Sequence, residues 1–212
     1  MFKALKHLSK GSELLYKALE HKFKALEHKL PRGVRKNPPK GKIFFLMVFI
    51  IFQNLIRIFV QAMDKTELRK YIFDQTKGHS TQELEEASRN ICEKLMEHER
   101  IKKAETIVLF WSLKNEVNTH ELIPRLVRDK NVIIITQSAD TPPVVPPQDA
   151  VIIVPGIAFD SKGYRLGRGK GYYDRFLGGL AENYKIGVCF PWQMVEKVPT
   201  DSHDVCVNEV IC

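Results

Sequence analysis

Residues 150–177 read AVIIVPGIAFDSKGYRLGRGKGYYDRFL, and the architecture follows from three features of this segment. The apolar run AVIIVP at 150–155 predicts a short strand that is buried on both faces. A loop rich in glycine and basic residues comes next, and a helix is expected to begin near Tyr172. A buried strand that leads through such a loop into a helix is typical of α/β proteins with a parallel sheet.

The same pattern extends outward on both sides of this segment. Three further apolar runs predict strands: TIVLFW at 106–111, which is expected to be buried, VIIIT at 132–136 and KIGVCF at 185–190. Helices are expected over 64–76, 81–100 and 119–127. Ser80 and Glu83 fit a capping box for the second, and Thr119 is the expected N-cap of the third. We therefore predict an α/β fold, Rossmann-like and three-layered, with a largely parallel or mixed sheet and helices on both faces.

Parallel sheets of this kind bind their ligands at the carboxyl ends of the strands. The loops after Trp111, Pro155 and Phe190 are therefore the places where chemistry is expected.

The charge of the chain is concentrated at one end. The 212 residues carry a formal charge of +8, but residues 1–62 hold 13 basic residues against 3 acidic ones, and the remainder is slightly acidic. The basic pI therefore gives no reason to expect a nucleic-acid partner. The four cysteines, which form no C-x-x-C pair, predict reduced thiols in a cytoplasmic protein rather than a disulfide scaffold or a zinc site.

Residues 1–62 predict an extension outside the fold. KALEHKF at 17–23 is repeated as KALEHKL at 24–30 in a helical pattern, a Pro/Gly-broken basic linker follows, and IFFLMVFIIF at 43–52 is continuously apolar. A membrane tether through residues 43–60 is one interpretation, but the run is shorter than the roughly 20 apolar residues that span a bilayer. Because Met63 begins the regular pattern, we favour a dispensable or misassigned extension, with residues 63–212 as the catalytic domain.

The glycine-basic loop carries the clearest chemical signal. Gly167, Gly169 and Gly171 alternate with Arg168 and Lys170, and Arg165 lies just upstream. Alternate glycines allow backbone N–H groups to approach an anion, and three cations in six residues favour a polyanion such as a nucleoside triphosphate. The spacing is neither that of a Walker A loop nor G-x-G-x-x-G, so on spacing alone a basic surface turn remains the alternative. Asp174, in the first turn of the following helix, suits the helix dipole or a Mg²⁺ ion.

This loop closely resembles the signature of the 5-formyltetrahydrofolate cyclo-ligase family. Three further segments agree in order: KTELR at 65–69, FWSLKNEVNT at 110–119 and VPTDSHDVCVNEVI at 198–211. The resemblance covers residues 63–212. It implies an ATP- and Mg²⁺-dependent ligase that converts 5-formyltetrahydrofolate to 5,10-methenyltetrahydrofolate, with ATP as co-substrate and a reduced folate as partner. In this chemistry the formyl oxygen is phosphorylated, folate N10 closes the ring, and ADP and phosphate are released.

The resemblance also implies roles for individual residues. Arg168 and Lys170 would be catalytic, Trp111 and Glu116 would bind the folate, and Asp174 and Asp204 would hold the metal. The residues implied to bind ATP are Lys65, Arg69, Arg165, Leu166, Gly167, Arg168, Gly169, Lys170, Gly171, Tyr172 and Tyr173. We expect a monomer without a membrane partner.

One departure from the family leaves a second hypothesis open. Residues 137–149, QSADTPPVVPPQD, form a short connector with four prolines, where the family has a longer segment that helps to enclose the folate. The nucleotide half of the site is complete, and the folate half is shortened. The chain is therefore either an active cyclo-ligase or an impaired relative that binds nucleotide or folate, and a different substrate or a pocket completed by a second copy are further interpretations of the short connector.

Overall fold

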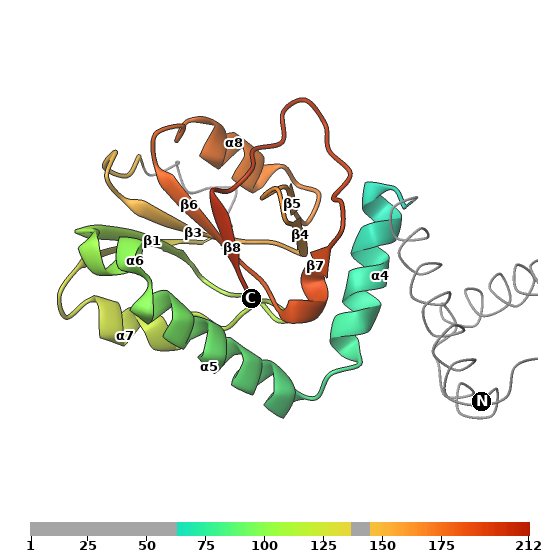
Figure 1. The fold of residues 1–212 in the computed structure, drawn as a ribbon, viewed down its shortest axis with the longest axis horizontal. Coiled ribbons are helices and arrows are strands. Elements are labelled where there is room, and N and C mark those ends of the chain that lie inside the picture. The colour runs from blue at the N-terminus through green and yellow to red at the C-terminus, as the bar shows by residue number, and fades with distance from the viewer. Residues whose placement is uncertain (1–62, 137–144) are drawn as a thin grey trace, which may run out of the picture. The chain divides into compact units, whose positions relative to one another are not determined.

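A computed structural model of the chain describes residues 63–136 and 145–212. In these residues five strands form one sheet in which every neighbouring pair is parallel (Figure 1). Their order across the sheet is β2 (Asn131–Ile135), β1 (Thr106–Phe110), β3 (Val151–Pro155), β6 (Tyr184–Val188) and β8 (Glu209–Ile211). All five residues of β1 and of β3 are buried, as their unbroken apolar runs predicted.

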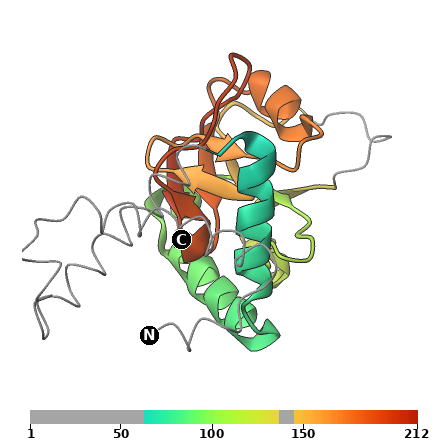
Figure 2. The ribbon, with the colours of Figure 1, turned by 90° about the vertical axis from the view of Figure 1, so that its right-hand side faces the viewer.

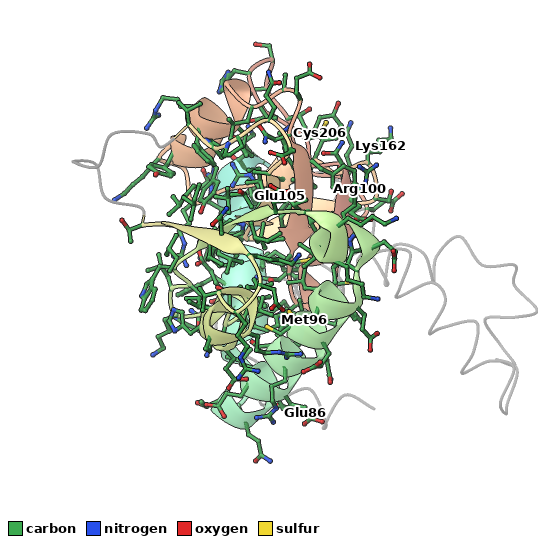
Figure 3. All side chains as sticks on the ribbon, turned by 90° about the vertical axis from the view of Figure 1, so that its left-hand side faces the viewer. Glu86, Met96, Arg100, Glu105, Lys162 and Cys206 are labelled. Carbon is green, nitrogen blue, oxygen red and sulfur yellow. The ribbon has the colours of Figure 1, made fainter. Side chains whose placement is uncertain are left out.

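Helices lie on both faces of this sheet. α5 (Thr81–Glu97), α6 (Glu99–Lys103) and α7 (Ile123–Leu126) lie on one face, and α8 (Tyr172–Gly178) lies on the other (Figure 1). The α/β prediction with helices on both faces is therefore confirmed. Figure 3 labels Glu86 and Met96 at different points along α5: Glu86 is exposed, whereas Met96 packs against the core.

The first helix of the described residues, α4 (Lys65–Lys77), stands apart from the other described helices (Figure 1). Figure 1 shows it beside β7, and Figure 2 shows its full length from another side. It packs against the η2 turn (Pro191–Gln193), and Leu68 and Ile72 are among its buried residues. The Trp192 indole N–H donates to Thr76 Oγ1 at 3.1 Å, which fixes the C-terminal part of α4 against that turn. An Asp64–Glu67 capping box starts the helix.

Two details of the predicted helices were wrong. The helix expected over 81–100 is interrupted at His98, whose extended backbone (ψ 128°) separates α5 from α6. The Ser80–Glu83 capping box at its start is confirmed. Thr119 does not cap the helix expected over 119–127, because its hydroxyl donates instead to the carbonyl of Phe110 at 3.0 Å. A short 3₁₀ turn, η1 (His120–Leu122), therefore precedes α7.

A second, three-stranded sheet was not foreseen from the sequence. Within the described residues it contains β4 (Ala158–Asp160) between β5 (Arg165–Leu166) and β7 (Met194–Val195). The buried carboxylate of Asp160 accepts backbone N–H bonds from Lys162, Tyr164 and Val198, and so holds the β4–β5 hairpin and the chain after β7 together. Val207 N donates to Gly163 O at 2.9 Å, and this bond connects the β4–β5 hairpin to the C-terminal segment. Figure 3 accordingly labels Lys162 and Cys206, the neighbours of these two residues, on the same side of the molecule.

The predicted extension lies outside the described residues, and so does the proposed tether over 43–60. The described residues all belong to one unit, Val60–Cys212. No helix within residues 63–136 or 145–212 is both long enough and apolar enough to cross a bilayer.

Candidate active site

A cleft of about 720 Å³ opens where the strand order of the main sheet reverses. The chain leaves β1 for β2 on one side and returns to β3 on the other, so the loops after β1 and β3 diverge at their carboxyl ends. Trp111, Glu116, Pro155 and Gly156 line the cleft together with residues of the glycine-basic loop. Its volume is in the range of small-molecule sites in proteins, roughly 300–1,000 Å³.

Of the three loops at strand ends that were expected to form the site, two line the cleft. The loops after Trp111 and Pro155 line the cleft, whereas the loop after Phe190 does not. Phe190 follows β6, which lies one strand beyond the point of reversal. Thr136, which follows β2, lines the cleft instead.

The glycine-basic loop takes a conformation that its glycines permit. Gly169 has φ +92° and Gly171, at the N-cap of α8, has φ +62°, a region that residues with a Cβ rarely adopt. At Gly167 the reason is space, because an added Cβ would lie 2.7 Å from Nη1 of Arg165. The loop can therefore pass close to both the Arg165 side chain and the start of α8.

Buried polar groups form the base of the cleft. The Arg165 side chain is only 3% exposed, and its Nη2 donates to Oδ1 of Asp174 at 2.8 Å. Its guanidinium also lies over the ring of Tyr173, with 5.3 Å between Cζ and the ring centroid. Arg165 Nε and the Tyr173 hydroxyl are both buried without a hydrogen-bond partner in the described part of the chain. Burial raises the pKa of Tyr173, so this hydroxyl remains a donor at neutral pH.

The loop after β1 is held by the Glu116 carboxylate. Its Oε2 accepts from Leu113 N at 2.9 Å, and Asn115 in this turn has φ +71°. The other oxygen, Oε1, accepts from Nε of Arg168 at 2.8 Å. One carboxylate therefore stabilises its own turn and also contacts the glycine-basic loop across the cleft.

Trp111 offers an aromatic surface at the opening of the cleft. The side chain is 47% exposed, and its ring lies 4.0 Å from that of His120. An indole that is supported on one face and exposed elsewhere can stack on a flat ligand such as a heterocycle.

A second group of charged residues lies at the start of α4. Lys65 and Arg69 are one turn apart, as predicted, but they contact different segments. The Arg69 Nε donates to Gly167 O at 2.8 Å, whereas Lys65 Nζ lies 2.7 Å from Asp201 and 2.5 Å from Asp204. Burial alone would lower the pKa of Lys65, but hydrogen bonds to the two carboxylates outweigh burial and raise it.

The structure brings most of the predicted site residues together. Lining the cleft are Trp111, Glu116, Arg165, Gly167, Arg168, Lys170, Gly171, Tyr172, Tyr173 and Asp174. Lys65, Arg69, Leu166, Gly169 and Asp204 do not line it. Leu166 is buried in β5, while Arg69 and Gly169 meet at the back of the loop. In the part of the chain that is described, the Lys170 amine makes no hydrogen bond or ion pair, so it is available to an anion.

The two carboxylates predicted to hold a metal do not form one cluster. Asp174 lines the cleft and is paired with Arg165, whereas Asp204 is grouped with Asp201 and His203, whose ligand atoms lie within 4.8 Å of one another. The Lys65 amine pairs with both carboxylates of this second group, so that one cation faces two anions. Of the two predicted ligands, only Asp174 lies at the cleft beside the cations of the glycine-basic loop.

Some residues of the site were not anticipated. Arg175 lines the cleft, and its Nη1 donates to the carbonyl of Lys170 at 3.1 Å, which fixes the last turn of the loop. It follows Asp174 directly, but nothing in its sequence position indicated this contact. Asp201 had a weak signal, because it lies three residues before Asp204 in the same C-terminal segment.

Comparisons with known proteins identify the family of this chain. The model of the 5-formyltetrahydrofolate cyclo-ligase family matches residues 139–212. A 5-formyltetrahydrofolate cyclo-ligase of Mycoplasma pneumoniae is 33% identical over 164 residues, which cover 70% of this chain and 98% of that protein. The mouse (Mus musculus) enzyme of the same name is 25% identical over 187 residues, covering 69% and 92%.

Solved structures show the same fold. A 5,10-methenyltetrahydrofolate synthetase of Aquifex aeolicus is similar with a TM-score of 0.61 and 31% identity, covering 70% of this chain and 89% of that one. The synthetase of Mycoplasma pneumoniae gives a TM-score of 0.60 with 28% identity, covering 70% and 98%. This chain therefore belongs to the 5-formyltetrahydrofolate cyclo-ligase family, whose members are ligases that form a carbon–nitrogen bond.

Proposed function

We propose that this chain converts 5-formyltetrahydrofolate to 5,10-methenyltetrahydrofolate with ATP and Mg²⁺. The observation that supports this most directly is the single cleft that joins an exposed indole and a carboxylate with the cations of the glycine-basic loop. The indole of Trp111 suits the flat pterin ring, and the Glu116 carboxylate suits its amino-imino edge. The cations suit a triphosphate.

The proposed reaction has two steps. The γ-phosphoryl group moves from ATP to the formyl oxygen of the folate, and ADP leaves. The lone pair of N10 then attacks the activated formyl carbon, the carbon–oxygen bond breaks with loss of phosphate, and N10 releases its proton. The protein mainly neutralises charge and aligns the reactants in such a phosphoryl transfer.

Two cations have distinct parts in this proposal. The amine of Lys170 is exposed at the cleft, so it would neutralise the transferring phosphoryl group as a mobile point charge. Arg165 is buried and held by Asp174, so it would be a fixed positive charge at the base of the cleft. Fixed charges favour the transition state because they need no reorganisation during the reaction.

The metal would enter with the nucleotide. Asp174 uses Oδ1 on Arg165, and its carboxylate is the one that would hold a Mg²⁺ ion at the cleft. When bound, Mg²⁺ supplies charge neutralisation on the phosphates. The role of Asp204 is then to hold Lys65 and the C-terminal segment beside α4.

A turnover assay tests the proposal. Purified full-length chain with 5-formyltetrahydrofolate, ATP and Mg²⁺ should produce the absorbance of the methenyl product, and omission of ATP should abolish it. Binding of both ligands without product would instead support the impaired relative that the shortened 137–149 connector suggested. A chain that binds neither ligand would contradict both hypotheses.

The remaining predictions concern the molecule as a whole. We propose that residues 63–212 are the catalytic domain and that they act in the cytoplasm as a monomer. Sedimentation of the full-length chain would test the monomer, and its fractionation between membrane and supernatant would test a tether through residues 43–60.

A further inference from the structure

The two substrate subsites of the cleft are joined by an ion pair. Nε of Arg168, from the glycine-basic loop, lies 2.8 Å from Oε1 of Glu116, from the loop after β1. Arg168 Nη2 also donates to the Lys114 carbonyl at 3.4 Å. Each residue of this pair was assigned to a different ligand: Arg168 to the triphosphate and Glu116 to the pterin.

Each ligand must therefore compete with the protein for its partner. A phosphate oxygen that pairs with Arg168 has to replace the Glu116 carboxylate. A pterin edge that donates to Oε1 of Glu116 has to replace Arg168. Binding of either ligand requires free energy to separate Arg168 from Glu116. Once the first ligand has bound, the pair is already broken, so the second ligand binds without this cost.

We propose that the Arg168–Glu116 ion pair couples the two subsites, so that nucleotide and folate each raise the affinity of the other. This inference rests on the proposed function, and it adds that the binding of nucleotide and the binding of folate favour each other. A ligand that favours the broken pair increases the population to which the other ligand binds, and the effect is equal in both directions.

The surroundings of the two side chains show which one moves. The Glu116 side chain is 8% exposed, and its second oxygen is held by Leu113 N, so the carboxylate keeps its place when the pair breaks. The Arg168 side chain is 40% exposed and lies between Gly167 and Gly169, so it can turn toward a phosphate without displacing a packed neighbour. Arg168 is thus the moving member of the pair.

Titration calorimetry on the full-length chain measures the coupling directly. AMPPNP with Mg²⁺ is titrated with and without saturating 5-formyltetrahydrofolate. This nucleotide is non-hydrolysable, so no turnover takes place during the titration. We expect the dissociation constant of the nucleotide to fall about fivefold when folate is present, at the lower end of measured couplings because the pair is partly exposed. The reciprocal titration of folate should show the same factor.

Glu116→Gln gives the sharper test, because it predicts a gain of affinity. The amide can still accept from Leu113 N, but it has no charge with which to hold Arg168. The variant should bind Mg·AMPPNP alone about fivefold more tightly than the wild type, and folate should no longer change that affinity. A residue that only supports the loop or only contacts folate would not increase nucleotide affinity when altered.

Arg125→Gln is the matched control, since it removes another Arg–Glu pair, to Glu93 at 2.7 Å, away from the cleft. It should leave the coupling unchanged. If both ligands bind the wild type but their affinities are independent, or if E116Q binds nucleotide no more tightly, the coupling is refuted and the proposed function stands. If neither ligand binds the wild type, the coupling and the proposed function both fail.

Discussion

Replacing Gly167 with alanine tests the packing of the glycine-basic loop against the base of the cleft. The new methyl group would lie 2.7 Å from Nη1 and 3.2 Å from Nη2 of Arg165. The end of an arginine side chain can usually move aside at little cost. Here it cannot, because the side chain is buried, bonded to Asp174 at 2.8 Å and packed over Tyr173.

The size of the effect follows from this ion pair. Removing one partner of a buried pair costs about 3–5 kcal/mol, and displacing the guanidinium without deleting it should cost about 2 kcal/mol. For a domain of this size that corresponds to a fall of about 4–8 °C in Tm. Because Arg165 lines the cleft, we also expect the affinity for Mg·AMPPNP to fall at least about tenfold, which is 1.4 kcal/mol.

Thermal unfolding of the full-length chain, followed by circular dichroism, measures the first effect, and calorimetry measures the second. Gly178→Ala is the matched control, because a Cβ at Gly178 meets no atom within 4 Å. This control should keep its nucleotide affinity and a Tm equal to or slightly above that of the wild type. A G167A variant with an unchanged Tm would show that Arg165 is not held as we describe.

Three further predictions test the cation at the cleft, the hairpin and the C-terminal ion pair. Lys170→Ala should weaken Mg·AMPPNP binding at least about tenfold with an unchanged Tm. Lys162 is an exposed lysine outside the cleft, so Lys162→Ala should leave the affinity unchanged. Equal affinities for the two variants would contradict the proposed role of Lys170. Asp160→Ala should lower the free energy of unfolding by about 3 kcal/mol in urea titrations, because three backbone N–H groups lose their acceptor, and a loss below 1 kcal/mol would be inconsistent with these bonds. Burial of Asp204 opposes its ionisation, but Lys65 and the backbone N–H of Asp201 together outweigh burial and hold the pKa of Asp204 below the ordinary 3.8. The ionised form of Asp204 therefore stabilises the fold above that pH, and this contribution is lost as the pH falls through the lowered pKa. The stability of Asp204→Asn should accordingly differ most from the wild type at neutral pH and converge with it in acid, and a constant difference would refute the assignment.

Local sequence signals were sufficient for most of the fold. Each of the four predicted strands lies within two residues of its observed position, because short apolar runs favour strands of a covered parallel sheet. Of these four, only the edge strand β2 is mostly unburied, since no strand of the described residues covers its outer side. The helix break at His98 was missed, because nothing in the periodicity before it changes. The short strands β4, β5, β7 and β8 were missed, because two or three residues carry no measurable alternation. The hairpin of β4 and β5 is held instead by the Asp160 carboxylate, which accepts from backbone N–H groups around it.

The sequence alone was sufficient to predict a phosphate-binding loop. The alternation of glycine with Arg168 and Lys170 indicates phosphate binding wherever the loop lies, because it depends on residue types that are adjacent in the chain. Only the tertiary structure decided which of these charges are already paired: Arg168 with Glu116, Arg165 with Asp174, and Lys65 with Asp201 and Asp204. All but one of these pairs join residues more than 50 positions apart, and Arg165 and Asp174 meet across the turns of the loop between them. Strand order and the closure of long loops bring such residues together, so no local pattern can predict which cation remains free for a ligand.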